Sequence, residues 1–188
     1  MTRIRRAPIH LVAATLAALF TATTTSLATA QESRESKIAR AMKAAPESVS
    51  RDATITDTDG TVLRPGSNGW HCQPGLAPGD DHPICNDAVW MELLKALGAK
   101  AAFTTDRVGI SYMLQGDAHV NNADPFDTKP DSGEAWVQEG PHLMIIVPDP
   151  AMLEGLPDDP SSGGAYVMWK GTPYAHLMIR VGSRPPGK

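Results

Sequence analysis

A repeated strand pattern near the C-terminus constrains the fold more than any other feature of the chain. The segments HLMIIV (residues 142–147) and HLMIRV (residues 176–181) share five of six residues, and each follows a tryptophan and a glycine. Their length, their apolar character and the turn formers around them predict two strands, each in a hairpin with the tryptophan-bearing segment before it. Consecutive hairpins favour an antiparallel sheet.

The alternation of side chains along a strand places related residues of the two segments on equivalent faces. His176, Met178 and Arg180 point to one side of their strand, which the arginine marks as the more polar side. The same parity aligns His142 with Met144. If the two strands are neighbours, these imidazoles and thioethers converge, and such a set suits copper outside the reducing cytosol. The alternative is that the methionines fill the core and the histidines hydrogen-bond to carbonyl groups.

Helical periodicity occurs at two places in the chain. Residues 32–45 carry a narrow apolar stripe, which predicts a helix within an N-terminal segment of residues 31–50. A stronger apolar pattern covers residues 87–97, where Asp87 can cap the first turn. Residues 51–188 are then expected to form a single α+β domain, in which a mainly antiparallel sheet built from hairpins packs against one or two helices.

Four shorter segments complete the expected order of elements. They are a hairpin around Asp59-Gly60, an irregular stretch over residues 65–85, a buried strand over residues 107–115 and a short helix over residues 149–155.

The first 30 residues have the three parts of an export signal. Arginines precede the apolar run LVAATLAALF, and small residues then lead to Ala28-Thr29-Ala30 before Gln31. This order predicts cleavage after residue 30. The threonine-rich residues 21–26 interrupt the apolar run well before the roughly 20 residues that a membrane span needs. The sequence therefore predicts a periplasmic or secreted protein that keeps no stable membrane anchor after cleavage.

Charge limits the partners of the mature chain. Removing residues 1–30 takes away three arginines and no acid, so the formal charge changes from −4 to −7, and nucleic acid is not an expected partner. The turn-rich loop of residues 116–133 is acidic, and loops of this length often bind ligands. We expect it either to be a solvated face or to bind a small molecule, a cation or a protein. Within it, Asp117 can orient His119 as a general base, or His119 is a solvated loop residue.

The two cysteines of the chain, Cys72 and Cys85, are expected to form a disulfide, because export brings them to an oxidising compartment. The alternative adds His71 and His82 to the two thiols as a zinc site. The spacing of this set matches no common zinc module.

Aromatic residues allow two readings as well. They either line a pocket for an apolar or sugar-like ligand or supply the bulk of the core. The residues concerned are Trp70, Trp136, Trp169, Tyr112, Tyr166 and Tyr174.

Five stretches of the chain together resemble a group of exported bacterial proteins of unknown function. These stretches are DGTVLRPGSNGWHCQP, AVWMELLKALG, YMLQGDAHVNNADPF, GPHLMIIVPDP and GGAYVMWKGTPYAHLMI. The resemblance covers most of residues 36–181. It implies export and a single domain, and it implies no activity, cofactor or catalytic residue.

These patterns together predict an exported binding or interaction domain. The candidate binding residues are Asp117, His119, His142, Met144, His176 and Met178. One alternative is a copper-binding protein that uses the His/Met strands. Another is a small periplasmic hydrolase that uses a cluster of the three histidines in this set. The sequence identifies no cofactor, no catalytic residue and no definite metal ligand.

Overall fold

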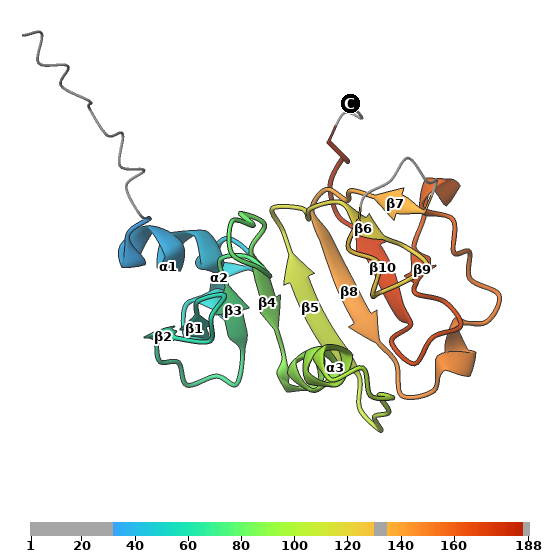
Figure 1. Cartoon of the computed structure of the whole chain (residues 1–188), viewed down its shortest axis with the longest axis horizontal. Helices are drawn as coiled ribbons and strands as arrows, with labels where there is room; N and C mark the ends of the chain where they lie inside the picture. Colours follow the sequence, from blue (N-terminus) through green and yellow to red (C-terminus); the bar gives the residue numbers. More distant parts are fainter. Residues whose placement is uncertain (1–31, 130–134, 186–188) are drawn as a thin grey trace, which may run out of the picture. The chain divides into compact units, whose positions relative to one another are not determined.

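The computed structural model describes residues 32–129 and 135–185 (Figure 1). The predicted export signal, residues 1–30, lies outside these ranges, and so does the end of the acidic loop. Residues Glu32–Lys188 form one compact unit. None of the helices described is both long enough and apolar enough to cross a membrane.

Within the described ranges, eight strands form one sheet in the order β2-β1-β3-β4-β5-β8-β10-β9, and β6 pairs with β7 in a separate hairpin. The strands are β1 (Thr54–Thr56), β2 (Val62–Arg64), β3 (His71–Gln73), β4 (Ile84–Asn86), β5 (Gly109–Met113), β6 (Val120–Asn121), β7 (Trp136–Val137), β8 (His142–Ile146), β9 (Tyr166–Met168) and β10 (His176–Arg180). The helices are α1 (Arg34–Met42), α2 (Glu47–Ser50), α3 (Ala88–Gly98) and the short 3-10 helices η1 (Pro150–Leu153) and η2 (Pro160–Ser162). Neighbouring strands are antiparallel except β1 and β3. The predicted α+β class is confirmed.

Helix α3 is joined to the sheet by its own N-cap. The Asp87 carboxylate accepts a hydrogen bond from the backbone N–H of Trp90 at 2.9 Å and another from the backbone N–H of Ile110 at 2.7 Å. The helix lies close to β5 because Gly109 has no side chain: a Cβ there would lie 2.8 Å from the Val89 side chain. Trp90 and Val89 are thereby buried against the sheet.

The expectation that residues 65–85 are irregular is confirmed for residues 65–70 and 74–83 and wrong for the two short strands within the stretch. Strand β3 and the start of β4 lie in it, and the two strands pair directly, with Cys72 opposite Cys85. Each strand has three residues, which is too short for an alternating pattern to be read from the sequence.

One of the two predicted C-terminal hairpins is confirmed and the other is wrong. Strands β9 and β10 are antiparallel neighbours, as expected. The first repeated segment, β8, instead lies between β5 and β10, while β7, which carries Trp136, pairs with β6. Strand β5 matches β8 over five residues, and this partner is distant in sequence, so local hairpin signals do not reveal it.

The His/Met face of β8 and β10 is the covered side of the sheet, contrary to the reading of Arg180 as a marker of a polar side. His142 and Met178 are fully buried, and His176 and Met144 are almost so. Helix α3 and the β6–β7 hairpin both lie over this face (Figure 1). Because these two elements cover it, its imidazoles are removed from water.

Candidate functional site

The two repeated strands are direct neighbours, and their register determines which side chains meet. Met144 of β8 is opposite Met178 of β10, and Met168 of β9 is opposite His176 of β10. Directly opposed residues project on the same face of a sheet with their Cβ atoms about 5 Å apart. His176 and three methionines therefore form one contiguous patch on the covered face.

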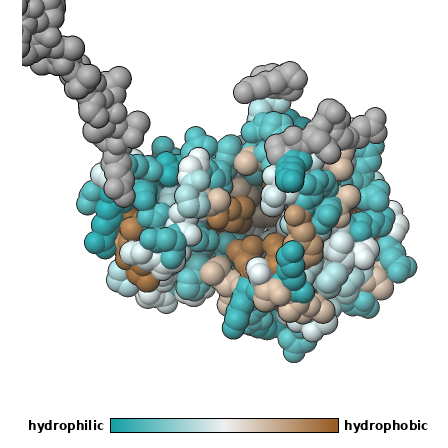
Figure 2. Space-filling model, viewed as in Figure 1, coloured by the Kyte–Doolittle hydropathy of each residue, from teal (hydrophilic) through white to brown (hydrophobic). Residues whose placement is uncertain are grey.

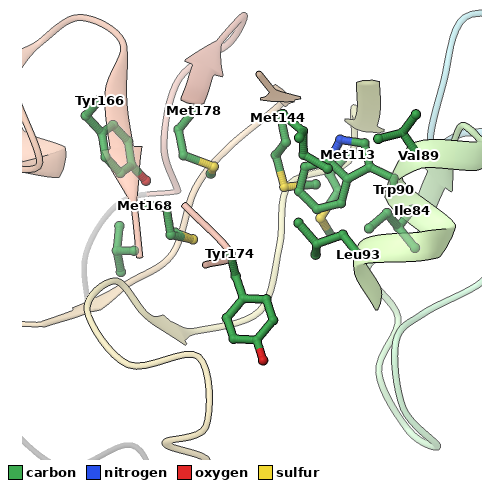
Figure 3. Packing of buried hydrophobic residues seen from close by; sticks show 12 residues of the cluster. Ile84, Val89, Trp90, Leu93, Met113, Met144, Tyr166, Met168, Tyr174 and Met178 are labelled. Atoms are coloured by element: carbon green, nitrogen blue, oxygen red, sulfur yellow. The ribbon is translucent and has the colours of Figure 1, made fainter. Parts of the chain in front are cut away.

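A cavity of about 80 Å³ lies against this patch, and we refer to it as the methionine cavity. Its lining includes the side chains of Met113, Met144, Met168, Met178, His176 and Trp90. Met144, Met168 and Met178 extend into the interior of the cluster from three different strands (Figure 3). Hydrophobic side chains surround a hollow on the same face of the molecule (Figure 2). The cavity thus combines thioether sulfur atoms with one imidazole in apolar surroundings.

The ring of His176 is held in one tautomer. Its Nδ1 lies 3.0 Å from the carbonyl oxygen of Tyr174, which can only accept, so Nδ1 carries the proton and Nε2 carries the lone pair. Nε2 is buried and has no hydrogen-bond partner among the residues described. Trp90 and Trp169 pack edge-to-face on the ring, with centroids 5.1 Å and 4.9 Å away. Burial lowers the pKa of His176 to about 4, so the imidazole is neutral at pH 7.

His142 is also held by a backbone carbonyl group two residues before it, but it lies at a different place on the sheet. Its Nδ1 lies 2.7 Å from the carbonyl oxygen of Gly140, and burial lowers its pKa. The antiparallel register places it opposite Arg180, at the other end of the strand pair from His176. It does not belong to the lining of the methionine cavity. Its Nε2 lies 4.0 Å from a carboxyl oxygen of Asp117.

Asp117 is a buried carboxyl group that also lines the methionine cavity. It accepts a hydrogen bond from the backbone N–H of Glu139 at 2.6 Å. Burial raises its pKa to about 8. Of the two readings for His119, the one in which Asp117 orients it gains no support, since Asp117 lines the methionine cavity and His119 lines a different, surface pocket. Glu139 follows strand β7 by two residues, and the hydrogen bond from its backbone N–H holds the Asp117 side chain in the interior.

Replacing Asp117 with asparagine tests this protonation state. The pKa of the native carboxyl is about 8, whereas in the unfolded chain the carboxyl has the ordinary aspartate pKa of 3.8. The native state then binds more protons in this interval, so the free energy of unfolding falls as the pH rises. Between pH 6.5 and 8 we expect urea titrations to show that this carboxyl costs the wild type about 1–2 kcal/mol, while the histidines, which titrate near pH 6.5 in the unfolded chain, contribute equally in both proteins. The loss should be much smaller in Asp117→Asn, and equal losses in both proteins would refute this assignment.

A second buried polar cluster lies next to Asp117 but away from the methionine cavity. The fully buried Glu139 carboxylate accepts hydrogen bonds from the Tyr166 hydroxyl and from Arg184 Nε, each at 3.0 Å, and forms a second bond with Arg184 Nη2. The carboxylate raises the pKa of the Arg184 guanidinium. This cluster fastens the C-terminal segment to the sheet.

The two cysteine sulfur atoms are bonded to each other, with an S–S distance of 2.03 Å. The disulfide prediction is confirmed, and the alternative zinc set is excluded because its thiols are not free. His82, which belonged to that set, instead lies beside Asp80, with its Nδ1 2.8 Å from a carboxyl oxygen.

The histidine cluster that the hydrolase alternative requires does not form. In the described parts of the chain, the one group of three or more His, Cys, Asp or Glu side chains with converging ligand atoms is Asp80, Asp81 and His82. His119, His142 and His176 are therefore dispersed. We find no nucleophile placed beside any of them within the residues described, so the geometry does not favour a hydrolase.

Three residues of the methionine cavity were not singled out as site residues from the sequence, whereas Trp169 was named there as a pocket or core aromatic. Met113 comes from β5, Met168 from β9 and Trp90 from α3. One backbone feature is unusual: Trp169 has φ of 56°, a conformation that is rare for a bulky side chain. The sequence does predict a hairpin that contains both Met168 and His176. Only the register of its strands, which the structure supplies, shows that these two residues are directly opposed.

Comparisons with protein-family models, with curated proteins and with solved structures gave no match to this chain. The resemblance to exported bacterial proteins remains an expectation from the sequence. The function therefore has to be inferred from the site itself.

Proposed function

We propose that this protein is an exported binding protein for Cu(I), which is held by Nε2 of His176 and by the sulfur atoms of Met144, Met168 and Met178. One observation carries the proposal: a buried imidazole nitrogen with a free lone pair borders the same small cavity as these methionines. Thioethers are soft ligands that select Cu(I), and imidazole is a good ligand for copper.

The surroundings of the site favour a soft monovalent ion over a divalent one. The cavity lining is mainly apolar, and the cost of moving an ion from water into such surroundings rises steeply with its charge. Zn²⁺ binds thiolate sulfur, imidazole and carboxylate, and Cu²⁺ prefers imidazole nitrogen and oxygen, whereas three of the four proposed ligands here are neutral thioethers. A cavity of about 80 Å³ also suits an ion better than an organic ligand, whose sites are commonly larger than about 300 Å³.

The contacts of His176 fix the orientation of the proposed imidazole ligand. The carbonyl oxygen of Tyr174 holds the ring of His176, which is how a ligating histidine is usually fixed from its other nitrogen. The edges of Trp90 and Trp169 prevent the ring from turning. The disulfide and the export signal suit a compartment where cytosolic thiols do not compete for copper.

The test is a titration of the exported protein with Cu(I) against a chromophoric Cu(I) chelator under anaerobic conditions. We expect one ion per chain, and we expect His176→Ala to weaken the affinity by at least about tenfold. His142→Ala is the matched control, because this histidine is on the same face and has the same carbonyl bond but lies outside the cavity. Its affinity should stay close to that of the wild type.

A second pair of variants tests the thioethers separately from the fold. Leucine is similar in volume to methionine, so the double substitution Met168→Leu/Met178→Leu keeps the packing and removes two sulfur atoms. We expect this variant to lose affinity by at least about tenfold, while the exposed Met152→Leu does not. Absence of Cu(I) binding in the wild type would reject the proposal. Binding that survives both the His176 and the methionine substitutions would also reject it.

A further inference from the structure

A second cavity, of about 420 Å³, lies at the surface beside the acidic loop, and we refer to it as the tryptophan pocket. Trp136 of β7 and Trp169 line it, together with the carboxylates Asp124 and Asp127. Trp136 does not belong to the lining of the methionine cavity. The tryptophan pocket can therefore be altered without touching the proposed copper ligands.

The carboxylates of the pocket are held in place by the loop. A carboxyl oxygen of Asp124 accepts from the backbone N–H of Phe126 at 2.8 Å, and one of Asp127 accepts from the backbone N–H of Lys129 at 3.1 Å. The other oxygen of Asp127 accepts from the Asn121 amide at 2.8 Å. A carboxylate has about four lone-pair sites, so both groups can still accept from a ligand. The loop presents fixed negative charge next to the two indoles.

The charge around the pocket favours a cation. Between residues 117 and 159 the sequence has ten Asp and Glu residues and one Lys or Arg, Lys129. Of these acids, Asp124 and Asp127 line the pocket, whereas Asp117 is protonated at pH 7 and Glu139 is paired with Arg184. The nearby loop residue Phe126 already has a cation on its ring, since Lys100 Nζ lies 5.1 Å from the ring centroid. Summed negative charge raises the local concentration of cations, and indole is the aromatic side chain that attracts them best.

We propose that the tryptophan pocket binds a small organic cation of the alkylammonium class. Two indoles favour an organic cation over a strongly hydrated metal ion, because its methyl or methylene groups pack on the rings. The volume falls in the range of small-molecule sites.

Choline and its neutral carbon isostere, 3,3-dimethylbutan-1-ol, test the proposal, because the two have nearly the same shape and differ in charge. We expect tryptophan fluorescence and calorimetry to show saturable binding of choline and binding of the isostere that is at least about fivefold weaker. Choline affinity should fall in Trp136→Leu and in Asp124→Asn. It should be unchanged in Trp70→Phe, since Trp70 packs on Tyr112 outside the pocket.

Circular dichroism must show that Trp136→Leu and Asp124→Asn remain folded. The two variants remove different parts of the pocket, an indole and a negative charge, so a loss of choline affinity in both would not result from one local distortion. Equal affinity for choline and the isostere would reject a cation site and leave an apolar pocket. Binding of cellobiose but not of choline would reject it in favour of a saccharide site. Absence of choline binding to the wild type at millimolar concentration would also reject it, and none of these results bears on the copper site.

Discussion

Replacing Glu139 with alanine is expected to lower the free energy of unfolding by about 2–4 kcal/mol at pH 7, because it removes the fully buried partner of an ion pair whose guanidinium is partly exposed. Glu139 is fully buried, and Arg184 has no other carboxylate within ion-pair distance among the described residues. The change also leaves the Tyr166 hydroxyl without its acceptor. Urea denaturation followed by tryptophan fluorescence measures the loss.

The position of Glu139 explains why the loss should extend beyond the ion pair itself. The next residue, Gly140, passes so close to the C-terminal segment that a Cβ there would lie 2.0 Å from the carbonyl oxygen of Ser183. The ion pair and this backbone contact together dock residues 181–185 on the sheet. Glu139→Ala should therefore loosen both the C-terminal segment and the contact of Tyr166 in β9 with Glu139.

Two further variants serve as controls for Glu139→Ala. Glu154→Ala removes an exposed acid from the same half of the chain and should change stability by no more than about 0.5 kcal/mol. In a double-mutant cycle, Arg184→Ala should cost less when Glu139 is already alanine, because the two side chains interact directly. Additive losses, or a loss below about 1 kcal/mol for Glu139→Ala, would show that the pair is not a buried charge pair.

Removing the disulfide by the double substitution Cys72→Ala/Cys85→Ala should cost about 3 kcal/mol. The bond closes a loop with a sequence separation of 13 and joins residues directly opposed on β3 and β4. The enclosed residues are rich in glycine and proline and gain conformational freedom in the unfolded chain when the bond is absent. Thermal and urea unfolding of the double variant measure the cost, and both cysteines are replaced so that no free thiol is left to bind copper.

The same loop forms a wall of the methionine cavity through Leu76 and Asp80. A hydrogen bond within the loop helps to order it: the Asp80 carboxylate accepts from the backbone N–H of Leu76 at 2.8 Å. Without the disulfide we expect the loop to open more often and the Cu(I) affinity to fall along with the stability. Unchanged stability in the double variant would mean that β3 and β4 hold the loop without the covalent bond.

The sequence by itself determined the features that depend on short stretches of chain. The cap and apolar face of α3, the hairpin at Asp59-Gly60 and the β9–β10 hairpin follow from local signals, and the structure confirms each of them. The disulfide follows from the presence of just two cysteines in a chain with a predicted export signal, and it is confirmed as well. The strand character of both HLMI segments is local for the same reason: alternation and β propensity are properties of neighbouring residues.

Only the tertiary structure decided which of these pieces meet. It placed β8 between β5 and β10, brought Met168 opposite His176, and separated His142 from His176 at opposite ends of one strand pair. It also drew Asp117 away from His119 toward Glu139. The physical reason is that strand partners and the burial of a sheet face depend on elements far apart in the sequence. The periodicity of a strand separates its two faces but does not say which of them α3 and the β6–β7 hairpin will cover.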